Sequence, residues 1–202
     1  RCIFCNQFKI TAKGTIPSLD EAESFIKQRL LQIPQNAENI QIAFFGGNFS
    51  GLDVNLQSAF LKIAQQFIDN DRVDSIRLST RPDYINDSIL ENFSKYSVRN
   101  IELGAQSFDN KTLKILERGH TAEQTEKASI LIKEFGFNLG LQMMVGLPEE
   151  DLNSAIFTAN EIVRLKADET RIYPLLVIEN TILEKMYNEG AYKPLSLSET
   201  IQ

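Results

Sequence analysis

The segment NLGLQMMVGLPEEDLNSAIFTANEIVRLKADETRIYPLLV, residues 138–177, decides the fold of this chain. It predicts a short apolar strand over residues 138–145, a helix over residues 149–166 and a final strand over residues 169–177. Two strands joined through a helix form a βαβ unit, whose strands run parallel because the helix carries the chain back across the sheet. The segment therefore predicts an α/β fold built on a parallel sheet.

The same alternation continues toward the N-terminus. Strands are predicted over residues 39–45, 73–78 and 98–103, and each is followed by apolar residues at helical spacing. Five strands therefore follow the cysteines near the chain start, and a sixth is expected before residue 1. The chain contains no low-complexity segment, flexible linker or shift of composition. We predict one domain over residues 1–202, a catalytic core that is a fragment of a longer protein.

Capping patterns mark where two of these helices begin. Ser18 with Glu21, and Thr121 with Gln124, have the spacing of a capping box, in which side chain and backbone satisfy each other's hydrogen bonds. Gly136 follows the second of these helices at the position where glycine commonly ends one. These local signals support the order of elements that the periodicity predicts.

Polar or glycine-rich residues follow nearly every predicted strand. An open dinucleotide-binding sheet would carry G-x-G-x-x-G after its first strand, and this motif is absent from the sequence. Open sheets gather functional residues at one switch point, whereas a barrel spreads them over the carboxyl ends of its strands. We therefore predict a partial TIM-type (β/α)6 barrel of parallel strands, with its first strand missing from this chain. The residues after the strands are Gly46-Gly47-Asn48, Ser79-Thr80-Arg81-Pro82, Gln106-Ser107, Gly146-Leu147-Pro148 and Tyr173-Pro174.

Composition limits the class of protein. The chain has 202 residues, 43% of them hydrophobic and 24% charged, which is typical of a globular domain. The apolar runs are too short to cross a membrane, so we expect no membrane partner. The formal net charge of −6 does not indicate a nucleic-acid clamp, although it is compatible with a local basic patch. Arg1 is preceded by neither Met nor a signal segment, so the chain is expected to begin inside a longer, cytoplasmic gene product.

The only two cysteines form one CxxC motif, Cys2-Ile3-Phe4-Cys5. This spacing indicates a reducing compartment and metal or redox chemistry. A zinc site would need two further ligands, and His120 is the single histidine. A thioredoxin-like dithiol would stand at a strand-to-helix turn, but residues 6–17 are non-helical in character. Half of an iron–sulfur site is the third alternative, and the motif alone does not choose among them.

Other motifs are ambiguous when each is taken alone. Gly46-Gly47 allows close backbone approach to a ligand but is also common in tight turns. Glu102 lies in a buried strand, where it either points into the barrel or lies at an edge. Arg118-Gly119-His120 has the form of a helix C-cap with a solvated arginine. None of these motifs establishes a function by itself.

The order and spacing of six motifs are more informative. They are Cys2-Ile3-Phe4-Cys5-Asn6, Phe44-Phe45-Gly46-Gly47-Asn48-Phe49, Leu78-Ser79-Thr80-Arg81-Pro82-Asp83, Glu102-Leu103-Gly104-Ala105-Gln106-Ser107 with Arg118-Gly119-His120, Met144-Val145-Gly146-Leu147-Pro148, and Arg171-Ile172-Tyr173-Pro174-Leu175 with Asn180-Thr181-Ile182-Leu183. Together they resemble the radical S-adenosylmethionine (SAM) superfamily. The resemblance is greatest to the radical-SAM domain of the Elongator catalytic subunit, and less close to oxygen-independent coproporphyrinogen dehydrogenase.

The resemblance implies two cofactors, a 4Fe–4S cluster and S-adenosyl-L-methionine. In this superfamily the reduced cluster cleaves SAM to a 5′-deoxyadenosyl radical, which abstracts hydrogen from a substrate. By matched position, Cys2 and Cys5 would be two iron ligands, the third lying four positions before Cys2. Gly46 and Gly47 would meet the methionyl amine through backbone carbonyls. Arg118 would bind the SAM carboxylate through a charge-assisted contact.

Three matched positions depart from common family patterns. Asn48 stands where many members have Glu and Elongator-type chains have Thr. Ser79 stands where some relatives place a Glu toward SAM, and Gln142 where some place an Asp toward the ribose. The residues implied to lie at the cluster or SAM are Phe4, Gly46, Gly47, Asn48, Ser79, Gln106, Arg118, Gln142, Met144 and Val145, with Phe4 beside the cluster and Met144 and Val145 at the adenine.

The resemblance also implies partners. We expect an electron donor such as flavodoxin or ferredoxin, and a small-molecule or RNA substrate of the tRNA-modifying or porphyrinogen type. The sequence identifies neither the substrate nor the oligomeric state. Two other classes stay open: a non-catalytic iron–sulfur or electron-relay barrel, and a TIM-type metabolic enzyme with an incidental CxxC.

Overall fold

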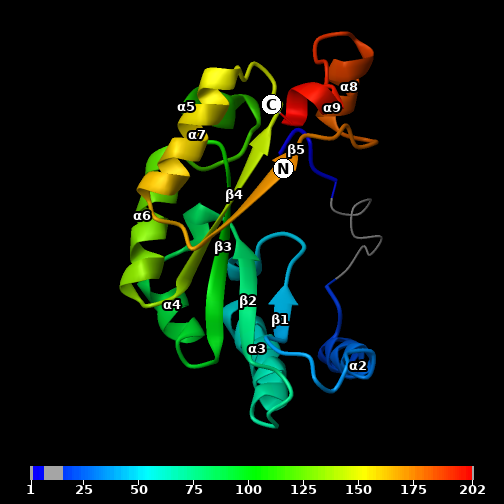
Figure 1. The fold of residues 1–202 in the computed structure, drawn as a ribbon, viewed down its shortest axis with the longest axis vertical. Helices are drawn as coiled ribbons and strands as arrows, with labels where there is room; N and C mark the ends of the chain where they lie inside the picture. The colour runs from blue at the N-terminus through cyan, green and yellow to red at the C-terminus, as the bar shows by residue number, and fades with distance from the viewer. Residues whose placement is uncertain (1, 7–15, 202) are drawn as a thin grey trace.

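A five-stranded parallel sheet forms the centre of the protein (Figure 1). The computed structural model describes residues 2–6 and 16–201. The strands lie side by side in sequence order, so every crossover steps in the same direction and the sheet has no switch point. This excludes the doubly wound arrangement and confirms a partial barrel. The strands are β1 (Gln41–Phe44), β2 (Ser75–Thr80), β3 (Val98–Gln106), β4 (Asn138–Val145) and β5 (Glu169–Pro174).

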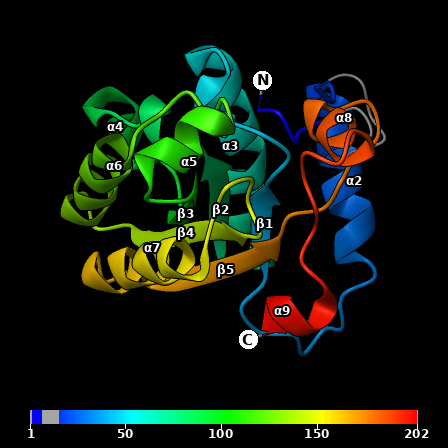
Figure 2. The ribbon, with the colours of Figure 1, turned by 90° about the horizontal axis from the view of Figure 1, so that it is seen from above.

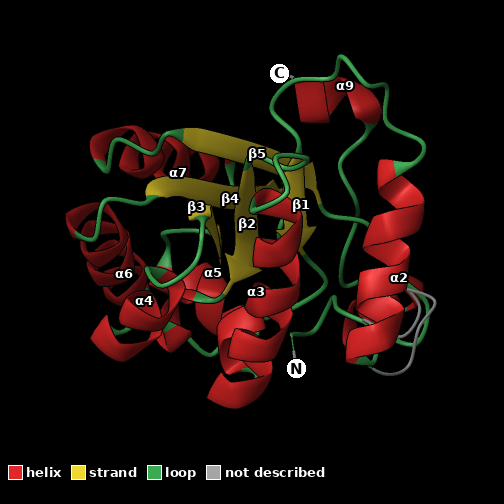
Figure 3. Cartoon of the chain, turned by 90° about the horizontal axis from the view of Figure 1, so that it is seen from below, coloured by secondary structure: helices red, strands yellow, loops and turns green. Residues whose placement is uncertain are grey.

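Helices α3, α4, α6 and α7 pack along one face of the sheet, α2 packs beside α3 through Ala22, Ile26 and Leu30, and α9 stands apart from this layer (Figures 2 and 3). Both expected capping boxes are present, at Ser18 with Glu21 and at Thr121 with Gln124. The described helices are α2 (Leu19–Leu30), α3 (Val54–Ile68), α4 (Asp87–Phe93), α5 (Asn110–Ile115), α6 (Ala122–Glu134), α7 (Leu152–Arg164), α8 (Ile182–Asn188) and α9 (Leu197–Ile201), with single 3-10 turns at Phe49–Gly51 and Pro82–Tyr84.

The apolar core lies between the sheet and the helix layer. Ile101 and Leu103 of β3 are fully buried there, as are Leu61 of α3 and Ile132 of α6. Burying an aliphatic side chain of this size contributes roughly 1.5–3 kcal/mol before entropy is counted. Every second residue of each strand points this way, because side chains alternate across a strand. The core therefore fixes which residues face the opposite side.

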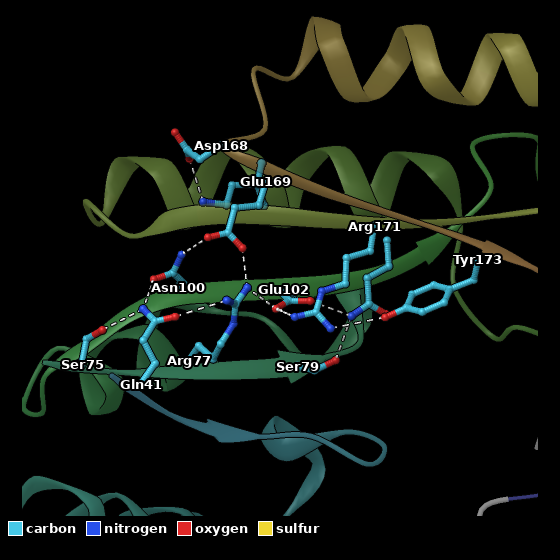
Figure 4. A network of polar contacts seen from close by, with 12 residues as sticks. Gln41, Ser75, Arg77, Ser79, Asn100, Glu102, Asp168, Glu169, Arg171 and Tyr173 are labelled. Atoms are coloured by element: carbon cyan, nitrogen blue, oxygen red, sulfur yellow. Dashed lines mark hydrogen bonds and ion pairs between the residues drawn. The ribbon is translucent and has the colours of Figure 1, made fainter. Parts of the chain in front are cut away.

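That opposite face is polar. It carries Arg77 of β2, Glu102 of β3, Gln142 of β4 and Arg171 of β5, which contact one another across the strands (Figure 4). Buried polar groups are tolerated only where they find partners. The sheet thus has an apolar outer face under the helices and a polar inner face, as expected for a barrel whose interior binds a ligand.

The predicted element boundaries need small corrections. The final strand ends at Pro174 rather than at residue 177, and helix α7 begins at Leu152, with Asp151 as its N-cap. Most of the non-helical stretch expected over residues 6–17 lies outside the described residues. Within the described part, none of the helices is long and apolar enough to cross a membrane. The extent of the domain, residues 1–202, stays a prediction.

Candidate functional site

The CxxC segment is attached to the protein by backbone hydrogen bonds on both sides. Ile3 donates to the carbonyl of Leu116 at 3.2 Å and accepts from the amide of Leu183 at 3.0 Å. The Ile3 side chain is buried in a small apolar cluster. Cys2 and Cys5 are both thiols and half-buried, and the Cys5 amide donates to the Cys2 carbonyl at 3.1 Å, forming a turn. The two sulfur atoms are therefore carried on a supported loop.

Arg118 joins this loop to the end of β3. Its Nη1 donates to Cys2 Sγ at 3.2 Å and its Nη2 to the carbonyl of Gly104 at 2.7 Å. A Cβ at Gly104 would lie 2.7 Å from Nη2, so a side chain there would displace the guanidinium from the strand. The expectation of a solvated arginine, drawn from the motif in isolation, is therefore wrong. Packing against β3, which lies well before it in sequence, aims Arg118 at the cysteines.

Gln106 lies beside Arg118 at the last position of β3. Its backbone has φ 69°, a left-handed conformation that is uncommon for a residue with a side chain. Gln106 Oε1 is buried without a hydrogen-bond partner, and so is Arg118 Nε, among the described residues. One is an acceptor and the other a donor. A ligand that brings both an ammonium and a carboxylate group would satisfy the pair.

The glycine pair after β1 presents exposed backbone at the same edge of the sheet. Gly46 has φ 108° and Gly47 has φ 147°, so both adopt backbone conformations that side chains disfavour. Asn48 fixes this turn, because its Oδ1 accepts from Thr80 Oγ1 at 2.6 Å and from the Arg81 amide at 3.3 Å. The Asn48 oxygen is thus engaged with the end of β2, while the glycine backbone stays accessible.

Glu102 is the centre of the polar inner face. It is 1% exposed, and its carboxylate accepts from Arg77, from Arg171 Nη2 at 3.1 Å and from Gln142 Nε2 at 2.9 Å (Figure 4). Of the two orientations that the sequence left open, Glu102 has the inward one. Ser79 joins the same group at the longer distance of 3.4 Å from Gln142 Nε2.

The loop after β4 is held from both sides. The Gly146 amide donates to Glu150 Oε2 at 2.9 Å, and the Gly146 carbonyl accepts from the Tyr192 hydroxyl at 2.8 Å. The Val145 carbonyl accepts from the amide of Leu175 at 3.0 Å. A cavity of about 550 Å³ borders Val145 and Leu175. Met144 packs against the Ile3 cluster, as Phe4 does.

The amino-acid sequence of this chain matches the models of a known protein family. The family model described as "Radical SAM superfamily" matches residues 1–162, and that described as "Radical_SAM C-terminal domain" matches residues 167–202. This chain belongs to the radical SAM superfamily.

Individual members of the superfamily show which of its proteins this chain is similar to. The tRNA uridine(34) acetyltransferase of Methanocaldococcus jannaschii is 30% identical over 87% of this chain and 36% of its own length. The solved structure of Methanocaldococcus infernus Elp3, with an N-terminal deletion, has a TM-score of 0.77 at 28% identity, covering 91% of this chain and 47% of that chain. Coproporphyrinogen III oxidase (HemN) of Escherichia coli has a TM-score of 0.68 at 18% identity, covering 99% and 46%, which shows the shared fold. The chain spans about a third of the length of the curated acetyltransferase it matches.

The described residues fit the cofactors of the radical SAM superfamily, a 4Fe–4S cluster and SAM. The thiols of Cys2 and Cys5 are the ligand type that iron–sulfur clusters use. The unpartnered Arg118 Nε and Gln106 Oε1 match the carboxylate and the ammonium of a methionyl group. The accessible backbone of Gly46-Gly47 lies at the same edge of the sheet.

Two further residues near the site, His120 and Arg81, had no role assigned from the sequence. His120 is 5% exposed, and its Nε2 lies 3.2 Å from the Ala105 carbonyl. The pKa of His120 is lowered to about 4, mainly by burial and to a smaller extent by the nearby positive charge of Arg118. The imidazole therefore stays neutral. Arg81 forms a bidentate pair with Asp83 at 2.9 and 2.7 Å, and this hydrogen bonding raises the pKa of Arg81. Arg81 directly follows β2, whereas His120 lies between α5 and α6, so only Arg81 had a position after a strand that could have indicated it.

A further cavity lies away from these residues. It has a volume of about 670 Å³ between α5, α6 and α7. Its lining includes the carboxylates of Asp109, Glu123 and Asp151 but none of the residues that the sequence motifs predicted. The radical SAM residues instead gather at the carboxyl ends of the strands.

Proposed function

We propose that this chain is the radical-generating core of an enzyme that modifies tRNA. The observation that carries the proposal is the position of Arg118, which contacts Cys2 while its Nε, like Gln106 Oε1, is buried without a partner among the described residues. This arrangement brings a cluster ligand and a binding site for an amino acid together. The tRNA part is supported by relatives such as the M. jannaschii tRNA uridine(34) acetyltransferase, at 30% identity. The HemN likeness, at 18% identity, bears on the fold, so a porphyrinogen substrate is not part of the proposal.

The residues of the chain have distinct roles in this mechanism. When bound, a 4Fe–4S cluster with Cys2 and Cys5 among its ligands would supply the one-electron chemistry that cleaves SAM and so leads to hydrogen abstraction from the substrate. Arg118 binds the carboxylate of the methionyl group, and Gln106 accepts from its ammonium. Gly46 and Gly47 offer backbone carbonyls to the same ammonium. The apolar cluster around Ile3 covers the cysteine loop and limits the access of water.

The polar inner face would hold the substrate. The face extends from Arg77, in the middle of β2, to Ser79 near the carboxyl end of that strand, so a substrate bound at the Ser79 end would lie next to the expected position of SAM. The electron would come from a one-electron donor protein of the flavodoxin or ferredoxin class. Both the substrate and this partner are part of the proposal.

Anaerobic reconstitution of the protein at its full natural length tests the proposal. We expect a 4Fe–4S absorption spectrum, release of 5′-deoxyadenosine on addition of dithionite and SAM, and faster release when unmodified tRNA is present. A cluster without 5′-deoxyadenosine would indicate an electron-relay module. Neither cluster nor 5′-deoxyadenosine would indicate a metabolic enzyme with an incidental CxxC. Release that tRNA leaves unchanged would contradict the tRNA substrate alone.

A further inference from the structure

The two edge strands of the sheet meet through their side chains. Four spacings of about 4.8 Å would separate β1 from β5 by about 19 Å in a flat sheet. Yet the Arg171 guanidinium of β5 lies 4.8 Å from the ring centroid of Phe45, which directly follows β1. Arg77 of β2 likewise contacts Glu169 of β5 (Figure 4). The sheet is curled enough for one small region to be lined from both edges.

Arg171 is held loosely in this region. Its Nη2 donates to Glu102 at 3.1 Å, and its Nη1 lies at the longer distance of 3.4 Å from the Tyr173 hydroxyl. Its side chain is 38% exposed, whereas that of Arg77 is 15% exposed and engaged by Glu102 and Glu169. Phe45 and Tyr173 are 47% and 39% exposed. A cation and two aromatic rings are therefore accessible together.

This accessible group lies next to the predicted SAM residues. Arg171 contacts Glu102, Glu102 accepts from Gln142, and Gln142 reaches Ser79. Ser79 and Gln142 occupy the positions that the family resemblance directs toward SAM. A ligand bound at Arg171 would thus be linked to Gln142 by two hydrogen bonds through Glu102, which places it near the SAM site, where a hydrogen donor has to lie.

The charges of the region favour an uncharged ligand. Arg77 and Arg171 supply two positive charges, which Glu102 and Glu169 balance through the contacts already given. An anion would disturb this balance, whereas a carbonyl oxygen can accept from the outward N–H groups of Arg171 without doing so. Aromatic side chains and a guanidinium plane also stack well on a flat ring. The chemistry thus selects a planar ring with carbonyl oxygens.

We propose that Arg171, Phe45 and Tyr173 form a subsite for a planar, carbonyl-bearing ring of the substrate, such as a pyrimidine base. The subsite rests on the proposed function, since it places the base of a tRNA nucleotide beside SAM. Arg171 donates to a ring carbonyl while keeping its contact with Glu102. Phe45 and Tyr173 provide the stacking surfaces.

Saturation-transfer NMR with uridine as the probe tests the subsite. The protein is reconstituted and loaded with SAM but given no reductant, so binding is measured without turnover. We expect transfer to the base protons H5 and H6, and a loss of affinity of about 10-fold or more in Arg171→Met, because hydrogen bonds from a charged donor are worth about 1.5–3 kcal/mol. Arg99→Met, at an exposed residue of β3, is the matched control and should bind uridine normally.

A milder variant keeps the test decisive if Arg171→Met does not fold. Tyr173→Phe keeps the ring but removes the hydroxyl that contacts Arg171 Nη1, so it should weaken uridine binding by a few fold through the position of Arg171. 5,6-Dihydrouridine, whose ring is not planar, should bind less well than uridine. Equal uridine affinity in the wild type and in the folded variants, absence of saturable binding, or tighter binding of inorganic phosphate would each overturn the subsite. Failure of the proposed function would be seen separately, as absence of 5′-deoxyadenosine from the wild type.

Discussion

Replacing Arg118 with alanine should weaken SAM binding selectively. The guanidinium contacts Cys2 Sγ and the Gly104 carbonyl, and its Nε is buried with no partner in the described part of the chain. A charge-assisted hydrogen bond contributes about 1.5–3 kcal/mol, and every 1.4 kcal/mol changes a dissociation constant about tenfold. The Arg118→Ala variant should therefore bind SAM roughly 10- to 100-fold more weakly. Arg118→Lys should be intermediate, because one ammonium cannot replace the planar fork.

Calorimetry on anaerobically reconstituted protein measures this loss, and fragments of SAM locate it. Methionine carries the carboxylate, so its affinity should fall by the same factor as that of SAM. 5′-Deoxyadenosine lacks the carboxylate and should bind the wild type and the variant equally. Unchanged SAM affinity in Arg118→Ala would remove Arg118 from the site. An equal loss for 5′-deoxyadenosine would show a general disturbance of the loop and would refute the carboxylate contact.

Three further predictions concern the network, a buried histidine and a cysteine. Gly140→Ala should lower the free energy of unfolding by roughly 1–3 kcal/mol in urea denaturation, because the new Cβ would lie 2.6 Å from Glu102 Cγ; an unchanged midpoint would contradict this. His120 has a pKa of about 4 in the folded protein, below its ordinary value of about 6.5, so the unfolded chain binds a proton at a higher pH than the folded protein does. The free energy of unfolding should therefore fall by up to about 3 kcal/mol as the pH drops from about 6.5 to 4. His120→Gln should flatten that slope in pH-dependent unfolding, and an identical slope would exclude His120 as its source. Cys5→Ala in the full-length protein should abolish both the brown chromophore and 5′-deoxyadenosine formation, and iron and sulfide assays that find four irons would disprove its role as a ligand.

Local sequence signals predicted most of the fold. The capping box at Thr121 and the apolar stripe after it mark helix α6 because both depend on residues three or four positions apart. These local signals did not predict the short helices. The six-residue helix α5 is too short to show a clear apolar period, and its N-cap, Asp109, gave no separate signal.

The sequence indicated some residues of the candidate site but not the contacts that hold them. The family resemblance implied that Gln106 and Arg118 both contact SAM, and in the structure both side chains lie close to Gly104. The same motifs did not show the role of Asn48, whose oxygen is engaged with Thr80, because that contact joins the loop after β1 to the end of β2. The motifs also did not reveal the partner of His120, because Ala105, whose carbonyl it contacts, lies fifteen positions away in sequence.

The sequence by itself determined the alternation of strands and helices, the parallel sheet and the superfamily, because these depend on local periodicity and on short motifs in a fixed order. Only the tertiary structure decided where the charged side chains point. Glu102 turned inward because Arg77, Gln142 and Arg171, from three other strands, surround its carboxylate. Arg171 reached Phe45 because the sheet curls. Such contacts join residues between 25 and 126 positions apart, and chain folding, rather than local preference, makes them neighbours.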